Sequence, residues 1–253
     1  MKKIAIVTGA SSGMGKEFLK TIPDHTDVDE IWAISRDKKA LEELQKEVTV
    51  RIIPLAFDLS EDKSISDIRK ILEKEKPIIK LLINAAGYGK FEKTTQISYE
   101  DNIGMIKLNC EGLTGMCLIS IPYMEKGSNI INFASVASFQ PVPYINIYAA
   151  SKAYVLSFSR SLNRELIKEG IHVMAICPYW TKTKFFDRAV TKNTIVKKYV
   201  AMYTPEDNVK KAWKDLKKEK DISQYGFIAK AQVKLCKILP HSLVMRIWEK
   251  QQK

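Results

Sequence analysis

Tyr148 and Lys152 are two side chains with acid–base chemistry, placed four residues apart in the stretch YINIYAASKAY (residues 144–154). Side chains at this spacing share one face of a helix. A lysine ammonium beside a phenol favours the ionised phenol, so it could bring a base with a pKa of about 10 into use for proton transfer. The same pair is also common on the surface of ordinary helices. These two residues alone leave both interpretations open.

A glycine-rich stretch, TGASSGMG (residues 8–15), joins the first apolar run to the first helical pattern. Gly9, Gly13 and Gly15 permit a tight turn and a close approach of the backbone to a pyrophosphate at a helix N-terminus. The spacing is G-x-x-x-G-x-G, which differs from the G-x-G-x-x-G of many dinucleotide-binding loops. An ordinary strand-to-helix turn is the alternative for this motif taken alone.

The second apolar run bears on which dinucleotide would bind. About 20 residues past the glycines, where an NAD site carries a ribose-binding acid, the chain has Ser35 followed by Arg36. A guanidinium suits a 2′-phosphate, so NADP(H) is predicted over NAD(H), although a surface arginine is the alternative. Asp58, after the third run, could accept a hydrogen bond from the adenine amino group or could cap the next helix.

The elements that must position these residues alternate along the chain. Strands are expected at residues 3–8, 30–35, 50–57, 79–85, 128–135, 171–177 and, as a short last strand, 222–227. Helices are expected at residues 13–22, 38–48, 62–76, most of 97–124, 146–166, 206–219, 228–239 and 242–250. Strands that are apolar throughout and separated by helices predict the α/β class, with a doubly wound (Rossmann) parallel sheet of about seven strands and helices on both faces.

The chain length of 253 residues suits one large domain. Residues 1–253 are expected to form a single dinucleotide-binding catalytic domain, in which residues 182–253 supply the substrate loop and a basic helical extension. The four cysteines form no CxxC pair and no metal-ligand spacing with the three histidines, so reduced thiols and no metal site are expected. The apolar run at residues 4–7 is too short for a signal peptide, and a cytoplasmic protein is predicted.

The five motifs TGASSGMG (8–15), NAAG (84–87), Asn109, Ser135 and YAASK (148–152) together resemble the short-chain dehydrogenase/reductase family over roughly residues 3–183. The resemblance implies that Tyr148 is the general acid/base and that Lys152 shifts its pKa and binds the nicotinamide ribose. Ser135 would hold the substrate oxygen, and Asn109 would anchor a water that links Lys152 to solvent. The residues implied to bind the cofactor are Gly9, Ser11, Ser12, Gly13, Met14, Gly15, Arg36, Asp58, Leu59, Asn84, Gly87, Tyr148, Lys152, Pro178 and Thr183.

Two positions depart from the family pattern. Ala85 stands where an asparagine is common, and Tyr179 follows Pro178 where a glycine is common. The C-terminus lacks the family's frequent glycine-rich ending and weakly resembles subgroups with basic helical C-termini that act on steroids and acyl chains.

An apolar substrate is predicted from the aromatic residues in the segment after the sixth expected strand and in the segment before Tyr148. The side chains expected to bind it are Phe139, Tyr144, Tyr179, Trp180, Phe185 and Phe186, together with Val142. A role in the core is the alternative for about half of them. The expected substrate is a bulky secondary alcohol or ketone, such as a hydroxysteroid or an anionic bile acid, and a 3-oxoacyl chain is the alternative.

The net charge of +12 lies mostly in the last quarter of the chain. Residues 182–253 carry 18 basic and 7 acidic side chains, a net of +11. An anionic substrate or an anionic membrane could explain the excess, and so could a solvated lysine-rich surface. Nucleic acid is not expected, because the segment holds no recognised binding module.

The amphipathic pattern of residues 228–239 leaves its partner open. Packing on its own domain or on another subunit is favoured over contact with a membrane surface. A non-catalytic NADP-binding or membrane-associated regulator is the alternative function, although the complete set of Ser135, Tyr148 and Lys152 argues against it. The family resemblance implies a homodimer or homotetramer.

Overall fold

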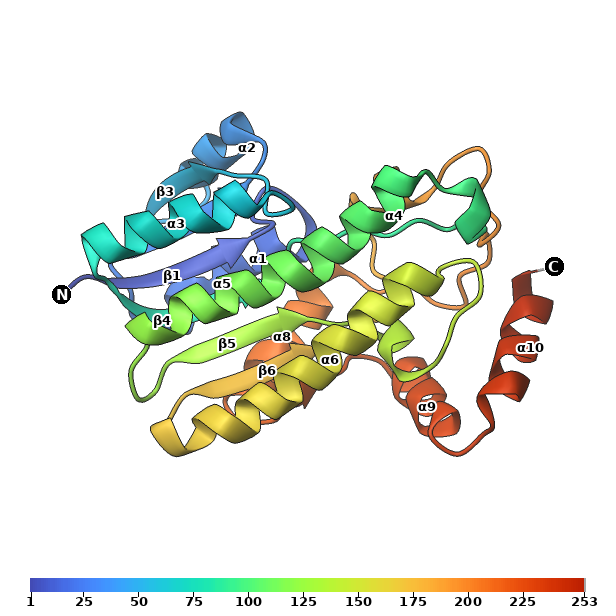
Figure 1. The fold of residues 1–253 in the computed structure, drawn as a ribbon. Coiled ribbons are helices and arrows are strands. Elements are labelled where there is room, and N and C mark those ends of the chain that lie inside the picture. The colour runs from blue at the N-terminus through green and yellow to red at the C-terminus, as the bar shows by residue number, and fades with distance from the viewer. Residues whose placement is uncertain (253) are drawn as a thin grey trace.

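A sheet of seven parallel strands forms the centre of the computed structural model, which describes residues 1–252 (Figure 1). The strand order is β3-β2-β1-β4-β5-β6-β7. The strands span β1 Lys3–Thr8, β2 Glu30–Ser35, β3 Arg51–Ala56, β4 Ile78–Asn84, β5 Asn129–Phe133, β6 His172–Ile176 and β7 Ile222–Ser223. The predicted doubly wound α/β fold is confirmed.

Helices cover both faces of this sheet because alternate side chains of each strand point to opposite sides. Ile4 and Ile6 of β1 belong to one apolar core, whereas Ala5 and Val7 belong to another. The first core is covered by α3 (Asp62–Glu75), α5 (Leu113–Ser120) and α6 (Asn146–Leu166), and the second by α1 (Gly13–Thr21), α2 (Lys38–Glu43) and α8 (Pro205–Leu216). Strands β1, β2, β4, β5 and β6 therefore carry buried apolar side chains toward both faces, as a sheet covered on both sides requires.

The order in which the chain adds strands to the sheet reverses at the neighbours β1 and β4: β2 and β3 lie beyond β1, whereas β5, β6 and β7 lie beyond β4. The β1–α1 loop and the loop that follows β4 therefore leave the same edge of the sheet in opposite senses. Ligands of open parallel sheets bind in the crevice outside the carboxyl ends of the strands at such a point. The fold thus places the glycine-rich stretch and the NAAG stretch side by side.

Three segments differ from the expected pattern in ways that matter for the site. The predicted helix over 97–124 is divided into α4 (Tyr99–Ile106) and α5 by a π-helical turn at Lys107–Gly112. The aperiodic segment after β6 contains one short helix, α7 (Phe185–Ala189). The predicted strand at 222–227 is reduced to β7, and Gly226, with a φ of 93°, is the N-cap residue of α9.

The last two helices, α9 (Phe227–Cys236) and α10 (His241–Gln252), lie beyond the carboxyl ends of the strands (Figure 1). Contacts between α9 and the turn after β5 hold α9 against the domain. Within residues 1–252, no helix is long and apolar enough to cross a bilayer.

Candidate active site

Tyr148 and Lys152 lie in the first two turns of α6, at the carboxyl edge of the sheet. Lys152 belongs to the buried stripe of α6, together with Ala149 and Val155, and only 4% of its surface is exposed. Its Nζ atom donates a hydrogen bond to the carbonyl oxygen of Phe133 at 2.6 Å and lies 5.8 Å from the centroid of the Tyr148 ring. A buried ammonium beside a phenol excludes the interpretation of this pair as a surface coincidence.

Burial shifts the acid–base properties of both groups. It raises the pKa of Tyr148 to about 12, although a hydrogen bond with Ser135 partly opposes the shift. It lowers the pKa of Lys152 to about 8, because the charged ammonium loses its hydration. At neutral pH the site therefore holds a protonated phenol next to a lysine that is mostly charged.

Ser135 follows the end of β5 and begins a short turn, Val136–Phe139, that faces α6. Its Oγ accepts a hydrogen bond from the amide of Ala137 at 3.1 Å. The turn is fixed to the helix because Ser138 Oγ donates to the carbonyl oxygen of Lys152 at 2.8 Å. These bonds hold the Ser135 hydroxyl on the side of the site where Tyr148 lies.

Asn109 lies in the π-helical turn between α4 and α5, a kind of distortion that often marks functional sites. Its Nδ2 donates to the Tyr88 carbonyl oxygen at 2.9 Å and to Ser151 Oγ at 3.0 Å, and its Oδ1 accepts from the Tyr88 amide. A Cβ atom on Gly87 would lie 2.9 Å from Asn109 Oδ1 and 3.3 Å from Lys152 Nζ. The two side chains therefore flank the same glycine, and the water that Asn109 is predicted to anchor stays a prediction.

A groove of about 390 Å³ crosses the carboxyl edge of the sheet, from the end of β2 to the start of α6. The predicted cofactor-binding residues that line it are Gly9, Ser11, Ser12, Gly13, Met14, Gly15, Arg36, Asp58, Leu59, Gly87, Tyr148, Lys152, Pro178 and Thr183. Gly9 and Gly13 have φ angles of 65° and 56°, which only glycine adopts readily. The glycine-rich stretch thus turns tightly where it lines this groove.

The start of α1 faces the groove with its backbone amides free of side-chain caps. Ser12 occupies the N-cap position but its side chain makes no capping hydrogen bond. The amide groups of a first helical turn, together with the helix dipole, attract anions. This end of α1 therefore fits a pyrophosphate.

Asn84, the remaining predicted cofactor residue, does not line the groove. Its side chain is buried below the sheet edge, where Nδ2 donates to Asn132 Oδ1 at 2.9 Å and contacts Cys117 Sγ. Asn84 ends β4, and the alternation of the strand points its side chain inward toward the core that α5 and α6 cover. Asn84 therefore links β4 to β5 and α5 through its side chain and does not form part of the groove wall.

Arg36 and Asp58 face each other across the ribose end of the groove. Arg36 Nη1 lies 3.8 Å from Asp58 Oδ2, and the arginine side chain is 63% exposed. Asp58 Oδ1 accepts hydrogen bonds from Ser60, and the N-cap position of α3 is occupied by Glu61, so Asp58 does not cap that helix. Although burial opposes the shift, the bonds from Ser60 and the charge of Arg36 hold the pKa of Asp58 below its usual value.

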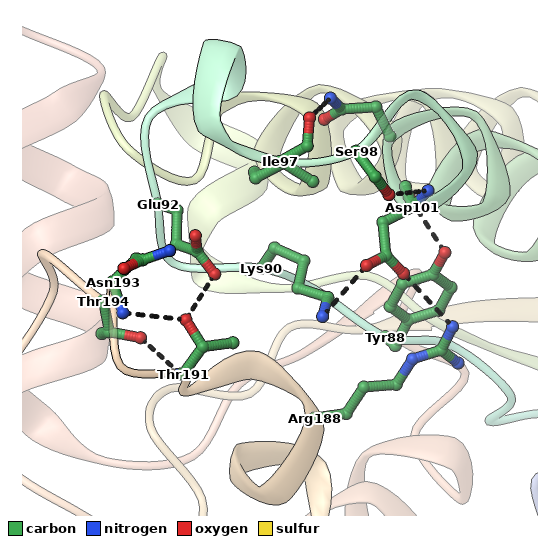
Figure 2. Close-up of polar contacts among 11 residues, drawn as sticks. Tyr88, Lys90, Glu92, Ile97, Ser98, Asp101, Arg188, Thr191, Asn193 and Thr194 are labelled. Atoms are coloured by element: carbon green, nitrogen blue, oxygen red, sulfur yellow. Dashed lines mark hydrogen bonds and ion pairs between the residues drawn. The ribbon is translucent and has the colours of Figure 1, made fainter.

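Several residues that line the groove were not predicted to bind the cofactor, among them Tyr88, Lys184 and Arg188. Figure 2 shows the Arg188 guanidinium against the Tyr88 ring, with its central carbon 3.3 Å from the ring centroid. Arg188 Nη2 also lies 3.7 Å from Asp101 Oδ1, and Lys90 Nζ lies 3.1 Å from Asp101 Oδ2. The segment that contains α7 has no periodicity, so no pattern indicated that Arg188 reaches the groove.

Further hydrogen bonds tie the α7 segment to the loop after β4. Thr191 Oγ1 donates to Glu92 Oε1 at 2.6 Å (Figure 2). The Phe91 amide donates to the Ala189 carbonyl oxygen, and the Ile195 amide donates to the Phe91 carbonyl oxygen. The α7 segment is thus held over the groove by backbone and side-chain contacts.

A second cavity, of about 430 Å³, adjoins the groove at Tyr148. Its wall is mainly apolar and includes the predicted substrate residues Tyr179, Trp180, Phe185 and Phe186, together with Val142. Phe139 and Tyr144 do not line it: Phe139 lies beside α9, and Tyr144 packs in the cluster around Phe91. Lys198 is the one lysine or arginine among the described residues of this wall.

Tyr148 lines both cavities, so this residue lies where a dinucleotide in the groove and an apolar molecule in the second cavity would meet. A protonated phenol with a neighbouring serine hydroxyl can exchange a proton with an oxygen atom placed between them. Within residues 1–252, no group of three or more His, Cys, Asp or Glu side chains could hold a metal ion. The arrangement therefore supports proton transfer coupled to chemistry on a bound dinucleotide.

Comparisons with known proteins agree with this geometry. The sequence profile of a family described as short chain dehydrogenase matches residues 3–194. An NADP-dependent 3-hydroxy acid dehydrogenase of Schizosaccharomyces pombe is 31% identical over 215 residues, which cover 81% of this chain and 83% of that protein. An uncharacterized oxidoreductase of Staphylococcus epidermidis is 30% identical over 179 residues, covering 70% of this chain and 77% of that protein.

Solved structures show the same fold. A short-chain dehydrogenase from Sphingobium yanoikuyae in complex with NADPH superposes with a TM-score of 0.77 at 25% identity, covering 94% of this chain and 96% of that one. A short-chain dehydrogenase/reductase from Burkholderia phymatum in complex with NAD has a TM-score of 0.80 at 22% identity, with 92% of each chain covered.

Proposed function

Because the chain belongs to the short-chain dehydrogenase family, and is therefore an oxidoreductase that acts on CH–OH groups, we propose that it uses NADP(H) to interconvert a secondary alcohol and a ketone. The substrate is bulky and apolar, and a hydroxysteroid or an anionic bile acid is the leading class. The observation that carries this proposal is the position of Tyr148 in the shared wall of the groove and the apolar cavity.

The groove suits NADP(H) at each of its parts. The uncapped amides of α1 would hold the pyrophosphate, and the exposed guanidinium of Arg36 would hold the 2′-phosphate. Asp37 also lines the groove, but its carboxylate accepts a hydrogen bond from the Ala40 amide as the N-cap of α2. The NADP dependence of the yeast relative and the NADPH bound to the bacterial one support the same choice.

Proton transfer at the substrate oxygen is the role of Tyr148. In the reducing direction, the Tyr148 hydroxyl gives its proton to the carbonyl oxygen, which Ser135 holds by a hydrogen bond. The Lys152 ammonium, 5.8 Å from the ring, stabilises the phenolate that remains. When bound, the nicotinamide supplies the hydride in this direction and accepts it in the other. Asn109 and Ser138 keep Lys152 and its turn in place.

The shape and charge of the apolar cavity support the substrate class. Aromatic and aliphatic side chains form most of the wall, and the exposed Lys198 lies next to the end of α10 through hydrogen bonds with Gln252. A substrate whose anionic group is remote from its hydroxyl would match this placement. A 3-oxoacyl chain is the second candidate, because the yeast relative is a 3-hydroxy acid dehydrogenase.

The test is turnover against a panel of steroids, bile acids, acyl ketones and sugars, followed as NADPH oxidation and NADP⁺ reduction. We expect activity on the first two groups. Activity confined to small polar ketones or sugars would overturn the substrate class.

The variant Tyr148→Phe tests the assignment of the proton donor. It removes one hydroxyl from the shared wall, so NADPH affinity should stay within about twofold while kcat falls by about 10²-fold or more. Cofactor binding is measured by fluorescence titration and turnover with the best panel substrate. Turnover near the parent level would refute the role of Tyr148.

We also propose that the chain is one domain and acts as a homodimer or homotetramer in the cytoplasm. The C-terminal part extends the same fold, because β7 pairs with β6 and Trp213 of α8 donates a hydrogen bond to Thr21 Oγ1 of α1. Leu118 of α5 and Tyr154 of α6 are 59% and 43% exposed on one face. This face would form the contact between subunits, and sedimentation of a Leu118→Glu variant tests it by the loss of oligomer.

A further inference from the structure

The helices α9 and α10 and the short connection between them, which we call the C-terminal arm, carry an unusual number of exposed apolar side chains. Six large ones have 38–85% of their surface in solvent: Phe227, Ile228, Leu235, Ile238, Leu243 and Ile247. Isolated surface leucines are ordinary, but a concentration of apolar side chains on two adjacent helices marks an interaction surface. We call these six residues the apolar face of the C-terminal arm.

The inward-facing side chains of the two helices are buried against the domain. Ala229, Val233 and Cys236 of α9 are buried, and the first two cluster with Val136 of the turn after β5. Trp248 of α10 is also buried, and its Nε1 donates to the carbonyl oxygen of Pro143 at 3.0 Å. The arm is therefore held in place without help from the apolar face.

A basic stripe runs beside the apolar face. Lys230, Lys234 and Lys237 are spaced four and three residues apart, so they share one side of α9. Residues 226–252 contain five lysines and arginines and a single acid, Glu249, a net of +4. A helix with an apolar face flanked by lysines is the arrangement that lies in the headgroup region of anionic membranes.

The apolar face is continuous with the cavity beside Tyr148. Phe227, Ile228, Leu235 and Ile247 line that cavity and are exposed to solvent as well. The cavity therefore opens toward the outer surface of the arm. An apolar molecule that leaves a lipid layer at this surface would pass between α9 and α10 without crossing water.

We propose that the C-terminal arm binds the surface of an anionic membrane and that apolar substrate enters the cavity from the lipid. The membrane contact rests on the arm alone, whereas the entry of substrate rests on the proposed function as well. Charge complementarity selects an anionic bilayer as the occupant. A second copy of the chain fits less well, because a twofold contact through this face would bring two identical basic stripes together.

The experiment is co-sedimentation of the full chain with vesicles of phosphatidylcholine, with and without phosphatidylglycerol. We expect binding that requires the anionic lipid and weakens with salt. The variant Lys230→Glu/Lys234→Glu/Lys237→Glu should bind at least about tenfold more weakly. Its matched control is Lys39→Glu/Lys63→Glu/Lys74→Glu, which makes the same change in net charge at exposed sites on α2 and α3 and should bind like the parent.

A second variant tests the apolar face apart from charge. Ile238→Ser/Leu243→Ser changes two exposed residues that do not line the cavity. It should lose vesicle binding while turnover of a water-soluble ketone is unchanged. Equal recovery of parent and both arm variants would overturn the proposal. So would an oligomer that the serine variant dissociates, because the face would then be a subunit contact.

Vesicle binding needs neither cofactor nor turnover, so the membrane contact and the proposed function can be refuted independently. An active enzyme that ignores anionic vesicles would overturn the membrane contact only. A chain that binds vesicles but reduces no ketone in the panel would overturn the proposed function only.

Discussion

The proposed chemistry of the site depends on Lys152, a lysine that the fold buries. Lys152 lies on the buried stripe of α6, and burial lowers its pKa to about 8. It is charged below that pH and can stabilise the Tyr148 phenolate, whereas above that pH it becomes neutral. The useful pH range of the enzyme should therefore be limited by Lys152 rather than by Tyr148, whose pKa is raised to about 12.

This gives a prediction for the pH profile of ketone reduction. With NADPH as the varied substrate, kcat/KM reports the ionisation of the free enzyme. It should be constant at neutral pH and decline above a pH of about 8, as Lys152 loses its proton. A profile that stays flat to pH 10 would show that the charge of Lys152 is not required.

On the proposed function, Arg36 selects NADP(H) over NAD(H). Arg36→Leu removes the guanidinium that would bind the 2′-phosphate, a charge-assisted bond of about 1.5–3 kcal/mol. NADPH should bind about 10- to 100-fold more weakly, with little change for NADH. Isothermal titration measures both constants, and Arg69→Leu on α3 is the control. An equal loss for both cofactors would contradict the assignment.

At the scale of elements, we expect the α7 segment to set the dissociation rate of the bound cofactor. Arg188 contacts Tyr88 and Asp101, so it connects α7 to the opposite wall of the groove. Arg188→Gln removes both contacts, and NADPH should leave several-fold faster because the segment is released. Stopped-flow displacement measures the dissociation rate.

A second variant distinguishes two roles of Arg188: holding α7 through Asp101, which we call the tether, and contacting the cofactor directly. Asp101 does not line the groove, but Arg188 and Lys90 both pair with it. If the tether matters, Asp101→Asn should also accelerate NADPH release. Release at the parent rate from this variant would mean that Arg188 acts on the cofactor directly.

The elements that periodicity defines could be predicted from the sequence, and those that tertiary contacts define could not. The bounds of β1, β2 and α6 match the expected ranges, because each is apolar or amphipathic along its length. The π-helical turn at Lys107–Gly112 has no pattern of its own, and Gly112 there packs closely against the backbone of Leu59. Contacts of this kind join residues that are distant in sequence.

The site shows the same division. Asn109, Ser135, Tyr148 and Lys152 were placed by a resemblance in motif and spacing, and the fold brings them to one edge of the sheet. Asn84 was misplaced because the motif gives its position but not the side of β4 to which its side chain points. Arg188 was missed because its role depends on Tyr88 and Asp101, which no local pattern connects to it.

For the whole molecule, a buried histidine at the opposite edge of the sheet links stability to pH. His172 begins β6, and burial lowers its pKa although Glu219 and Asp221 oppose the shift. Above about pH 6.5 both folded and unfolded chains leave it neutral. Below that pH the unfolded chain takes up a proton that the folded chain resists, so the free energy of unfolding decreases as pH falls.

The prediction is a loss of up to about 1.4 kcal/mol per pH unit below pH 6.5, part of which His172→Gln removes. Urea unfolding at pH 7.5, 6.5 and 5.5 measures it. His241→Gln, at an exposed position, is the control and should keep the parent slope. A His172 variant with the parent slope would show that other groups cause the acid sensitivity.

The positions of the four tryptophans make intrinsic fluorescence a probe of the apolar cavity. Trp180 and Trp248 both line it and stack with ring centroids 6.4 Å apart. The other two, Trp32 and Trp213, lie in the two core layers. A molecule that fills the cavity changes the surroundings of one pair of indoles and leaves the other pair as a constant background. Intrinsic emission can therefore follow the binding of an unlabelled compound, including an inhibitor that is never turned over.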